Sequence, residues 1–260
     1  MPATTFSIAN QKGGVGKTTS AVNLAAGLAR RKLRTLLVDM DQQASATSAL
    51  GIEKRPGASL YQVLMGNGSA SEKILDAGRE NLHIIPSEVD LSAIEVELSG
   101  TENYLMRLRE ALAPIKNSDA YDAIVIDAPP SLGLLSMNSL VASDYLLIAL
   151  QAEYMAMEGL GQIMGVVNQL QEAGISDELQ VGGILLTMYD SRTNLSKQVA
   201  NEVRQHLGNL VFKTMIPRTV ALAEAPSFGR TIFEHARFNM GSFAYDNFAK
   251  EVIKRFNLKK

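Results

Sequence analysis

The sequence lacks cysteine altogether and has only three histidines in 260 residues. The absence of cysteine excludes disulfide bonds, thiolate catalysis and cysteine-ligated iron–sulfur clusters. The three histidines lie far apart along the chain, which argues against a structural zinc site. Thiol chemistry and zinc–thiolate chemistry are therefore excluded as functions of this protein.

Long apolar runs are also missing. No stretch of about 18 apolar residues occurs, so no membrane-spanning helix is expected. The N-terminus leads directly into a strand-like segment, without the basic start and apolar centre of a signal peptide. We therefore expect a soluble cytoplasmic protein. Its length of 260 residues and hydrophobic content of 46% allow a sizeable core, and we treat residues 1–260 as a single domain.

The overall charge excess is small, with 25 Lys and Arg against 27 Asp and Glu, and predicts neither a nucleic-acid nor a membrane partner. The distribution along the chain is uneven. From Leu186 to the C-terminus there are 12 basic and 6 acidic residues, whereas residues 1–185 have 13 basic and 21 acidic ones. The C-terminal third is thus a basic region on an otherwise acidic protein.

Short apolar segments alternate with segments of helical period. The predicted strands are Thr5–Ala9, Thr35–Asp39, Leu82–Ile85, Ala123–Asp127, Tyr145–Leu150, Val181–Met188 and Phe212–Ile216. The predicted helices are Ala21–Arg31, Asn103–Ala113, Leu134–Ala142, Glu158–Ala173, Leu195–Leu207 and Gly241–Phe256, and the Gly- and Ser-rich stretch 51–78 predicts short helices and loops. Strands that are apolar on both faces suit a parallel sheet covered by helices on both sides. We therefore predict an α/β, doubly wound fold with a mainly parallel sheet.

A glycine-rich segment links the first predicted strand to the first predicted helix, which is the context of a phosphate loop. Its glycines let backbone N–H groups point at phosphate oxygens, Lys17 adds a full positive charge, and the hydroxyl of Thr18 is placed to bind Mg²⁺. The common pattern has a glycine where Gln11 stands, and the extra Lys12 marks a deviant form. The expected nucleotide-binding residues here are Lys12, Gly13, Gly14, Val15, Gly16, Lys17, Thr18 and Thr19. A turn that merely joins strand and helix is the alternative, and the Gly-Lys-Thr-Thr sequence argues against it.

Acidic residues end two other predicted strands. Asp39 and Asp41 follow one strand, and Asp127 ends another. The ligand crevice of an open α/β sheet lies beyond the carboxyl ends of its strands, so all three carboxylates should meet the phosphate loop there. We expect Asp127 and Asp41, with Thr18, to serve the magnesium ion, and Asp41 to orient or activate the attacking water. Capping of the next helix is the alternative role for a strand-terminal aspartate.

Five short motifs follow one another along the chain. They are Lys12-Gly-Gly-Val-Gly-Lys-Thr-Thr, Asp39-Met-Asp-Gln-Gln, Ile126-Asp-Ala-Pro-Pro-Ser, Leu186-Thr-Met-Tyr-Asp, and Ile216-Pro-Arg through Glu224-Ala-Pro-Ser-Phe-Gly. Together they resemble the ParA/Soj chromosome and plasmid partitioning ATPases, within the deviant phosphate-loop class that includes MinD. The resemblance extends from about Thr5 to Phe256.

The resemblance implies an ATPase that uses ATP and Mg²⁺ and forms an ATP-dependent sandwich homodimer. Lys12 would reach the partner subunit's phosphates while Lys17 works in its own site, which makes Asp41, Lys12 and Lys17 the expected catalytic residues. Pro217 and Arg218 would contact adenine. The ATP-bound dimer would bind DNA without sequence preference, on the nucleoid, and a ParB-like partner would stimulate slow hydrolysis and release.

The chain departs from this family pattern in three places. Gln42 and Ala44 replace the usual proline and glycine after the acidic pair. Only nine residues precede Asn10, so we expect no N-terminal DNA-binding extension. Ala221 stands where relatives often have an arginine that helps bind DNA, whereas Arg192 matches a second DNA-binding arginine. With Arg192 and Arg218 as the DNA contacts, fewer phosphates are neutralised and binding should be weaker.

Two alternatives concern the basic C-terminal third. The Lys and Arg side chains of this region could form a surface that binds DNA, or they could simply be exposed to solvent. The candidates for DNA contact are Arg192, Arg218, Arg230, Arg237, Lys250, Lys254 and Arg255. The last helix could dock on a membrane, as in a MinD-like spatial regulator of cell division or cargo positioning, but packing of its apolar face on the sheet is favoured. An amidoligase of this fold would need a substrate pocket that the sequence does not identify.

Overall fold

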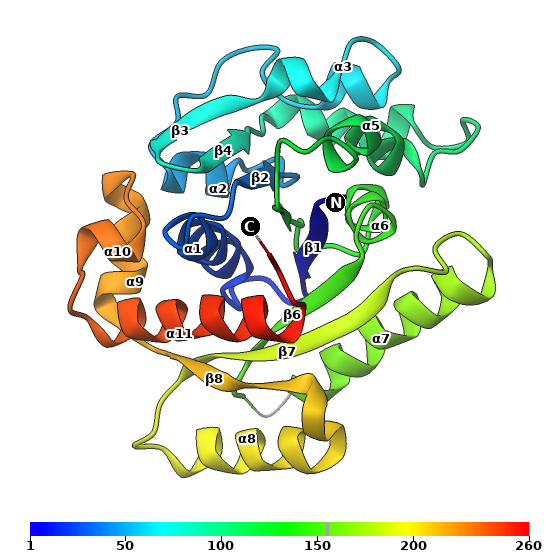
Figure 1. Cartoon of the computed structure of the whole chain (residues 1–260). Coiled ribbons are helices and arrows are strands. Elements are labelled where there is room, and N and C mark those ends of the chain that lie inside the picture. The colour runs from blue at the N-terminus through cyan, green and yellow to red at the C-terminus, as the bar shows by residue number, and fades with distance from the viewer. Residues whose placement is uncertain (154–155, 260) are drawn as a thin grey trace.

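The computed structural model describes residues 1–153 and 156–259, and its centre is one eight-stranded sheet (Figure 1). The strands are β1 (Thr4–Ala9), β2 (Thr35–Asp39), β3 (Leu75–Arg79), β4 (Leu82–Ile85), β5 (Ala123–Asp127), β6 (Tyr145–Gln151), β7 (Gln180–Tyr189) and β8 (Val211–Pro217). Their order is β3-β4-β2-β5-β1-β6-β7-β8, and the pairs are parallel except that β3 runs antiparallel to β4. The carboxyl ends of β1, β2 and β5 therefore lie side by side.

Helices cover both faces of this sheet (Figure 1). They are α1 (Lys17–Ala29), α2 (Ser45–Ala49), α3 (Tyr61–Leu64), α4 (Ile94–Glu97), α5 (Arg107–Lys116), α6 (Leu134–Val141), α7 (Ala156–Glu172), α8 (Asn194–Leu207), α9 (Val220–Glu224), α10 (Ile232–His235) and α11 (Met240–Arg255). The helices α1 and α11 pack on one face, and α5 to α8 pack on the other. The predicted fold class is confirmed.

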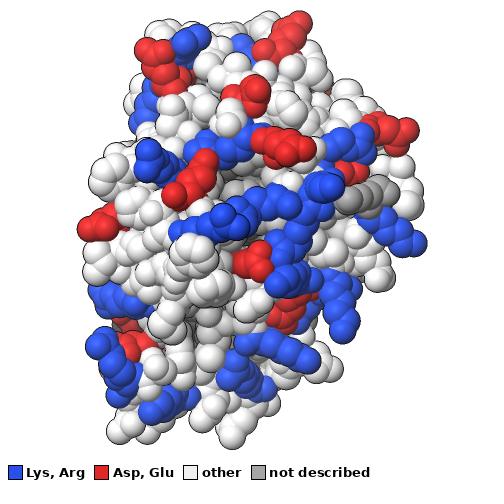
Figure 2. All heavy atoms as spheres, turned by 60° about the vertical axis from the view of Figure 1, so that its left-hand side comes forward, with Lys and Arg blue, Asp and Glu red and all other residues white. Residues whose placement is uncertain are grey.

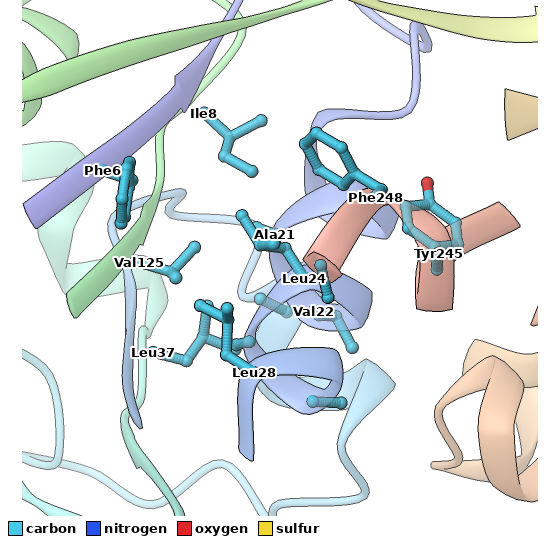
Figure 3. Close-up of a cluster of buried hydrophobic side chains, with 14 of the residues drawn as sticks. Phe6, Ile8, Ala21, Val22, Leu24, Leu28, Leu37, Val125, Tyr245 and Phe248 are labelled. Atoms are coloured by element: carbon cyan, nitrogen blue, oxygen red, sulfur yellow. The ribbon is translucent and has the colours of Figure 1, made fainter. Parts of the chain in front are cut away.

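The core between the sheet, α1 and α11 explains why the central strands are apolar on both faces. Figure 3 shows Leu24 and Leu28 of α1 directed at Leu37 of the sheet, with Phe248 of α11 beside them. These side chains are fully buried. The opposite face of the same strands packs under the other helices, so alternate residues of one strand enter different cores.

The longer predicted elements match the observed ones to within a few residues, but the short helices α2, α4, α9 and α10 were not predicted. Three further differences have a local cause. The strand β3 was missed because only Ala77 of its five residues is buried, and it carries Asp76 and Gly78 instead of apolar side chains. The helix α1 begins at Lys17, four residues before the predicted start, because the phosphate-loop residues themselves form its first turn. The helix α5 runs from Arg107 to Lys116, so the predicted start at residue 103 was wrong.

The last helix packs as the favoured alternative predicted. Phe248 and Val252 of α11 are fully buried against α1 and β8, and Phe256 just beyond it contacts the rings of Phe6 and Tyr145. Phe243 is the exception, since the residue is 54% exposed. Among the described helices, none is both long and apolar enough to cross a membrane.

Candidate nucleotide site

The segment between β1 and α1 forms a tight loop at the carboxyl edge of the sheet. Gly14 and Gly16 have φ angles of 74° and 87°, which lie in the left-handed region that favours glycine. The neighbouring strands hold the loop in place. The side chain of Asn10 donates to the carbonyl of Ala149 over 2.7 Å, and the hydroxyl of Thr187 donates to the carbonyl of Val15 over 2.7 Å.

A cavity of about 370 Å³ opens over this loop. It is lined by Gly13, Gly14, Gly16, Lys17, Thr18 and Thr19 from the loop, and by Val22, Asn23, Asp41, Ser45, Ala49, Pro130, Met188, Ala225, Pro226 and Arg230 from elsewhere. Lys17 is buried, and its Nζ donates to the carbonyl of Lys12 over 3.0 Å. Burial lowers the pKa of Lys17, and the nearby carboxylates of Asp127 and Asp41 oppose that effect. The cavity therefore contains a desolvated ammonium group with donors to spare.

The second lysine of the loop lies elsewhere. The side chain of Lys12 is half exposed, and its Nζ forms an ion pair with Glu153 at 2.8 Å. Lys12 does not line the cavity that Lys17 lines, so the two ammonium groups have different surroundings. Val15 is buried and contributes its carbonyl to the bond from Thr187 rather than its side chain to the cavity.

The two strand-terminal carboxylates, Asp39 and Asp127, are register partners on β2 and β5. Asp39 is occupied by the chain itself, because it accepts bonds from the backbone and hydroxyl of Thr47 at 2.8 and 2.7 Å and from the backbone of Asp41 at 3.2 Å. Burial raises the pKa of Asp39 to about 6 despite these bonds. Asp39 thus anchors the turn into α2.

Asp127 is the contrasting case. It is completely buried, and neither carboxylate oxygen has a hydrogen-bond partner among the residues that the structure describes. Burial raises its pKa well above the ordinary value, Asp39 and Asp41 raise it further, and the nearby hydroxyl of Thr18 and the ammonium of Lys17 lower it. A buried carboxylate without partners beside a threonine hydroxyl fits a divalent cation.

No group of three His, Cys, Asp or Glu side chains in the described ranges could hold a metal by itself. Magnesium does not require such a cage, because it keeps several waters and takes further ligands from phosphate. The donors present, Thr18 and Asp127 together with Asp41, fit that cation when a nucleotide supplies phosphate oxygens.

Asp41 reaches the cavity from the loop after β2. Its Oδ1 accepts the backbone N–H of Gln43 over 2.9 Å, and its carbonyl accepts the hydroxyl of Ser87 over 2.6 Å. Ala44 follows with a φ angle of 54°, in the left-handed region that favours glycine. The loop therefore keeps the glycine conformation at a cost of about 1–2 kcal/mol.

A second cavity of about 480 Å³ adjoins the first, since Gly16, Thr19 and Met188 line both. Pro217 and Arg218 line this second cavity and not the first. Met188 stands at the junction with a φ angle of 50°, a strained conformation of the kind that gathers at binding sites. The phosphate loop and the expected adenine contacts thus belong to one continuous depression.

Arg192 also lines the second cavity, but its guanidinium is engaged. Its Nε and Nη2 donate to the two carboxylate oxygens of Asp190 over 2.9 and 2.7 Å, while 87% of the side chain stays exposed. The hydrogen bonds from Arg192 lower the pKa of Asp190 to about 2. Arg218 is exposed nearby.

Lys and Arg side chains gather in a band over the face that carries α9, α10 and α11, with acidic side chains among them (Figure 2).

Arg255 must be removed from the candidates for DNA contact. It is folded inward, donates to the carbonyls of Gly182 and Leu210 over 3.0 and 3.1 Å, and lies 4.0 Å over the ring of Phe212. Lys250 is exposed but paired with Asp246 at 2.8 Å.

Sequence reasoning missed part of the cavity wall, namely Ser45, Ala49, Pro226 and Arg230. The Glu224-Ala-Pro-Ser-Phe-Gly motif was the available signal for Pro226. Asn23 lines the cavity, but its side chain is used within the protein: it donates to the carbonyl of Thr19 over 2.8 Å and accepts the backbone N–H of Ile232 over 2.9 Å.

Residues 3–181 match the family model described as AAA domain. The sporulation initiation inhibitor protein Soj of Bacillus subtilis is 46% identical over 248 residues, which is 95% of this chain and 97% of Soj. The chromosome partitioning protein ParA of Myxococcus xanthus is 45% identical over 249 residues, 95% of this chain and 87% of that protein. A crystal structure of cobyrinic acid a,c-diamide synthase from Mycobacterium smegmatis with bound ADP and magnesium is 32% identical, with a TM-score of 0.84 over 98% of this chain and 96% of that one. The chain belongs to the ParA/Soj family of chromosome-partitioning ATPases.

Proposed function

We propose that this protein is an ATP-driven partitioning switch whose nucleotide occupies the two adjoining cavities. The buried, unpartnered carboxylate of Asp127 beside Thr18 and Lys17 carries the proposal, because a magnesium ion and phosphates would satisfy all three groups. The phosphates would meet the loop Gly13–Thr19, and the base would lie towards Pro217 and Arg218. The bound magnesium would neutralise charge on the phosphates.

Hydrolysis is assigned to Asp41. Its Oδ1 is fixed by the backbone of Gln43, and the residue lines the phosphate cavity, which suits a group that orients a water molecule. The backbone of the loop and Lys17 would hold the phosphates for the attack. A single carboxylate with these partners supports slow turnover, and an activating group from a ParB-like partner would then speed the reaction.

Dimerisation is assigned to the outward lysine. Lys12 is half exposed, is paired with Glu153 and does not line its own cavity, so its ammonium could be offered to the phosphates of a partner subunit. Residues 3–181, the part that matches the family model, include both lysines of the loop. ATP would then be the ligand that joins two copies of the chain.

The cargo of the dimer is DNA in this proposal. Arg192 and Arg218 line one cavity, and Figure 2 shows Lys and Arg side chains gathered in a band on one face of the molecule. Contacts of this kind reach phosphates rather than bases, so binding should depend steeply on salt and little on sequence. ATP-bound dimers would associate with the nucleoid.

A second candidate is a MinD-like membrane-associated regulator. The observation in its favour is the exposure of three apolar residues, Phe238, Met240 and Phe243, at 83%, 70% and 54%. The buried apolar face of α11 weighs against it, because that face is already packed on the protein.

Binding experiments separate the two candidates. DNA binding by the purified protein is measured with ATP, with ADP and without nucleotide, at two salt concentrations, and co-sedimentation with anionic vesicles is measured under the same conditions. The partitioning switch predicts ATP-dependent DNA binding that weakens steeply with salt, and no vesicle binding. ATP-dependent vesicle binding without DNA binding would refute it.

A further inference from the structure

Two walls of the phosphate cavity come from segments about 180 residues apart. Ser45 and Ala49 belong to α2, whereas Pro226 and Arg230 belong to the segment that begins with the 3-10 helix η4 (Ala225–Phe228). The two segments meet at a glycine of each, Gly51 after α2 and Gly229 just before Arg230, where there is no room for a side chain.

That meeting point is a contact between Gly51 and Gly229. Both have φ angles in the left-handed region, 74° and 60°. A Cβ on Gly229 would lie 2.7 Å from the Cα of Gly51, closer than real Cβ atoms approach backbone. The backbones of the two walls therefore touch directly.

One side chain holds both sides of this contact. Arg79, at the end of β3, donates from Nη1 to the carbonyl of Leu50 over 3.0 Å and from Nη2 to the carbonyl of Gly229 over 2.9 Å. Leu50 directly follows Ala49 of one wall, and Gly229 directly precedes Arg230 of the other. A single planar guanidinium thus fixes the distance between the walls.

Arg79 is itself held in one orientation. Its Nη1 also donates to the carbonyl of Ala77, and its Nε lies 3.0 Å from both carboxylate oxygens of Glu234. Glu234 in turn accepts the backbone N–H and the hydroxyl of the buried Thr231 at 2.8 and 2.9 Å. Each nitrogen of the guanidinium has a partner, and a guanidinium makes such a fork where an ammonium does not.

The hydrogen bonds continue from there to the phosphate loop. Ile232, next to Thr231, donates its backbone N–H to Asn23, and Asn23 donates to the carbonyl of Thr19 in the first turn of α1. The wall at η4 is thereby tied to the loop helix as well as to α2. Nothing in this network requires a ligand to be present.

We propose that Arg79 is a positioning residue that sets the width of the nucleotide cavity by clamping α2 to the segment after η4. The inference rests on the proposed function, in which Mg-ATP occupies this cavity. Arg79 touches neither the cavity nor the reacting atoms, so it acts through Leu50 and Gly229. Its loss should weaken nucleotide binding more than it slows the chemical step.

The test compares Arg79→Lys with the matched control Arg255→Lys. Arg255 is also partly buried, at 23% side-chain exposure against 18% for Arg79. It donates to two backbone carbonyls, where Arg79 donates to three, and it lines neither cavity. KM and kcat for Mg-ATP and the melting temperature without nucleotide are measured for both. Arg79→Lys should raise KM about tenfold, equivalent to about 1.4 kcal/mol of binding, with kcat changed much less. Arg255→Lys should lower the melting temperature and leave KM unchanged.

The outcomes separate this inference from the function beneath it. A wild-type chain that binds no Mg-ATP would overturn both. Normal KM in Arg79→Lys, or an equal rise in KM in Arg255→Lys, would overturn the clamp alone, because the change would then be absent or merely reflect lost stability.

A glycine pair tests the same joint without touching the arginine. Gly229→Ala forces a Cβ against the backbone of Gly51, whereas Gly57→Ala introduces a Cβ at a φ angle of 80° with nothing within 4 Å. Both variants carry the backbone strain of a left-handed alanine, and only the first wedges the walls apart. Gly229→Ala should raise KM for Mg-ATP and Gly57→Ala should not; equal values in the two would overturn the proposal.

Discussion

The carboxylates at the two ends of β5 have opposite surroundings, whereas Asp39 at the carboxyl end of the neighbouring β2 is hydrogen-bonded like those at the amino ends. At the amino ends, the carboxylates are paired. Asp122 accepts hydrogen bonds from the backbone N–H and from Nη2 of Arg34, over 2.7 and 2.6 Å. Asp144 accepts hydrogen bonds from the backbone N–H of Thr5 over 2.8 Å and from Nζ of Lys116 over 2.5 Å. At the carboxyl ends, Asp127 is fully buried and has no hydrogen-bond partner within the described residues.

This difference indicates which end of the sheet binds a ligand. A buried charge without a partner costs stability, whereas a paired one is nearly neutral or helpful. Asp122, just before β5, is paired with Arg34, whereas Asp127, at the end of β5, is buried without a partner. Asp127 therefore lowers the stability of the fold, and stability alone does not explain its presence. Groups left in this state are where a ligand is expected.

Lys17→Ala should produce the largest effect and sharpen the comparison most. The phosphates would lose their main cationic side chain, and charge-assisted hydrogen bonds contribute about 1.5–3 kcal/mol each, so ATP affinity should fall by about a thousandfold. Equilibrium binding of Mg-ATP measures it. Lys116→Ala, at the amino end, is the control and should cost stability while leaving ATP affinity intact; unchanged affinity in Lys17→Ala would refute the placement of the phosphates.

Asp41→Ala should separate binding from turnover at the carboxyl end. Removal of the group that orients water should lower kcat by about a hundredfold, the lower range for a positioned acid or base. ATP binding should persist, and the ATP-bound dimer should accumulate because it cannot hydrolyse its ligand. Rate measurements and size-exclusion chromatography with ATP follow both effects, and a variant that stays monomeric with ATP would contradict the switch.

The residues at the carboxyl ends could largely be predicted from the sequence, because their signals are local. The strand β2 is an apolar run that ends in Asp39, and the phosphate loop is one contiguous segment between β1 and α1. Brief apolar runs and glycine spacing suffice for such features. The predicted edges of β2, β4 and β5 match the observed bounds for that reason.

What the sequence could not predict depends on contacts between distant segments. The ion pair of Arg34 with Asp122 and the clamp at Arg79 join residues 88 and 150 positions apart. The strand β3 carries Arg79 but reads as a polar loop, since it pairs only at the edge of the sheet. The burial of the Arg255 guanidinium against backbone carbonyls could not be predicted either, because the sequence shows a charged residue but not its hydrogen-bond partners.

Asp127→Asn should have opposite effects on the free and the nucleotide-bound protein: it should stabilise the free protein and weaken the binding of ATP with magnesium. Burial raises the pKa of Asp127, so the charged form is disfavoured in the fold, and the amide should raise the free energy of unfolding without nucleotide by about 1 kcal/mol or more at neutral pH. That gain should shrink as the pH falls and the wild-type carboxyl becomes protonated. With magnesium present, the affinity for ATP should instead drop about tenfold.

Thermal unfolding with and without Mg-ATP, at two pH values, measures both signs. Asp122→Asn is the matched change at the other end of β5, where the carboxylate is paired with Arg34, and it should lower stability at neutral pH. Equal effects of the two substitutions would break the comparison between the ends of the strands.

Ala221→Arg tests whether the basic side chains near the second cavity act together on DNA, and it should have the smallest effect. Ala221 is only partly buried against the core, so the stem of an arginine can follow that apolar surface and place its guanidinium in solvent near Arg218. Each dimer would gain two phosphate contacts, so binding should tighten several-fold and the slope of log K against log salt should steepen by about 2. Ala221→Gln adds a long polar side chain without charge and should leave the slope unchanged. If the arginine also leaves it unchanged, α9 does not face DNA, and the unpaired charge at the carboxyl ends serves the nucleotide alone.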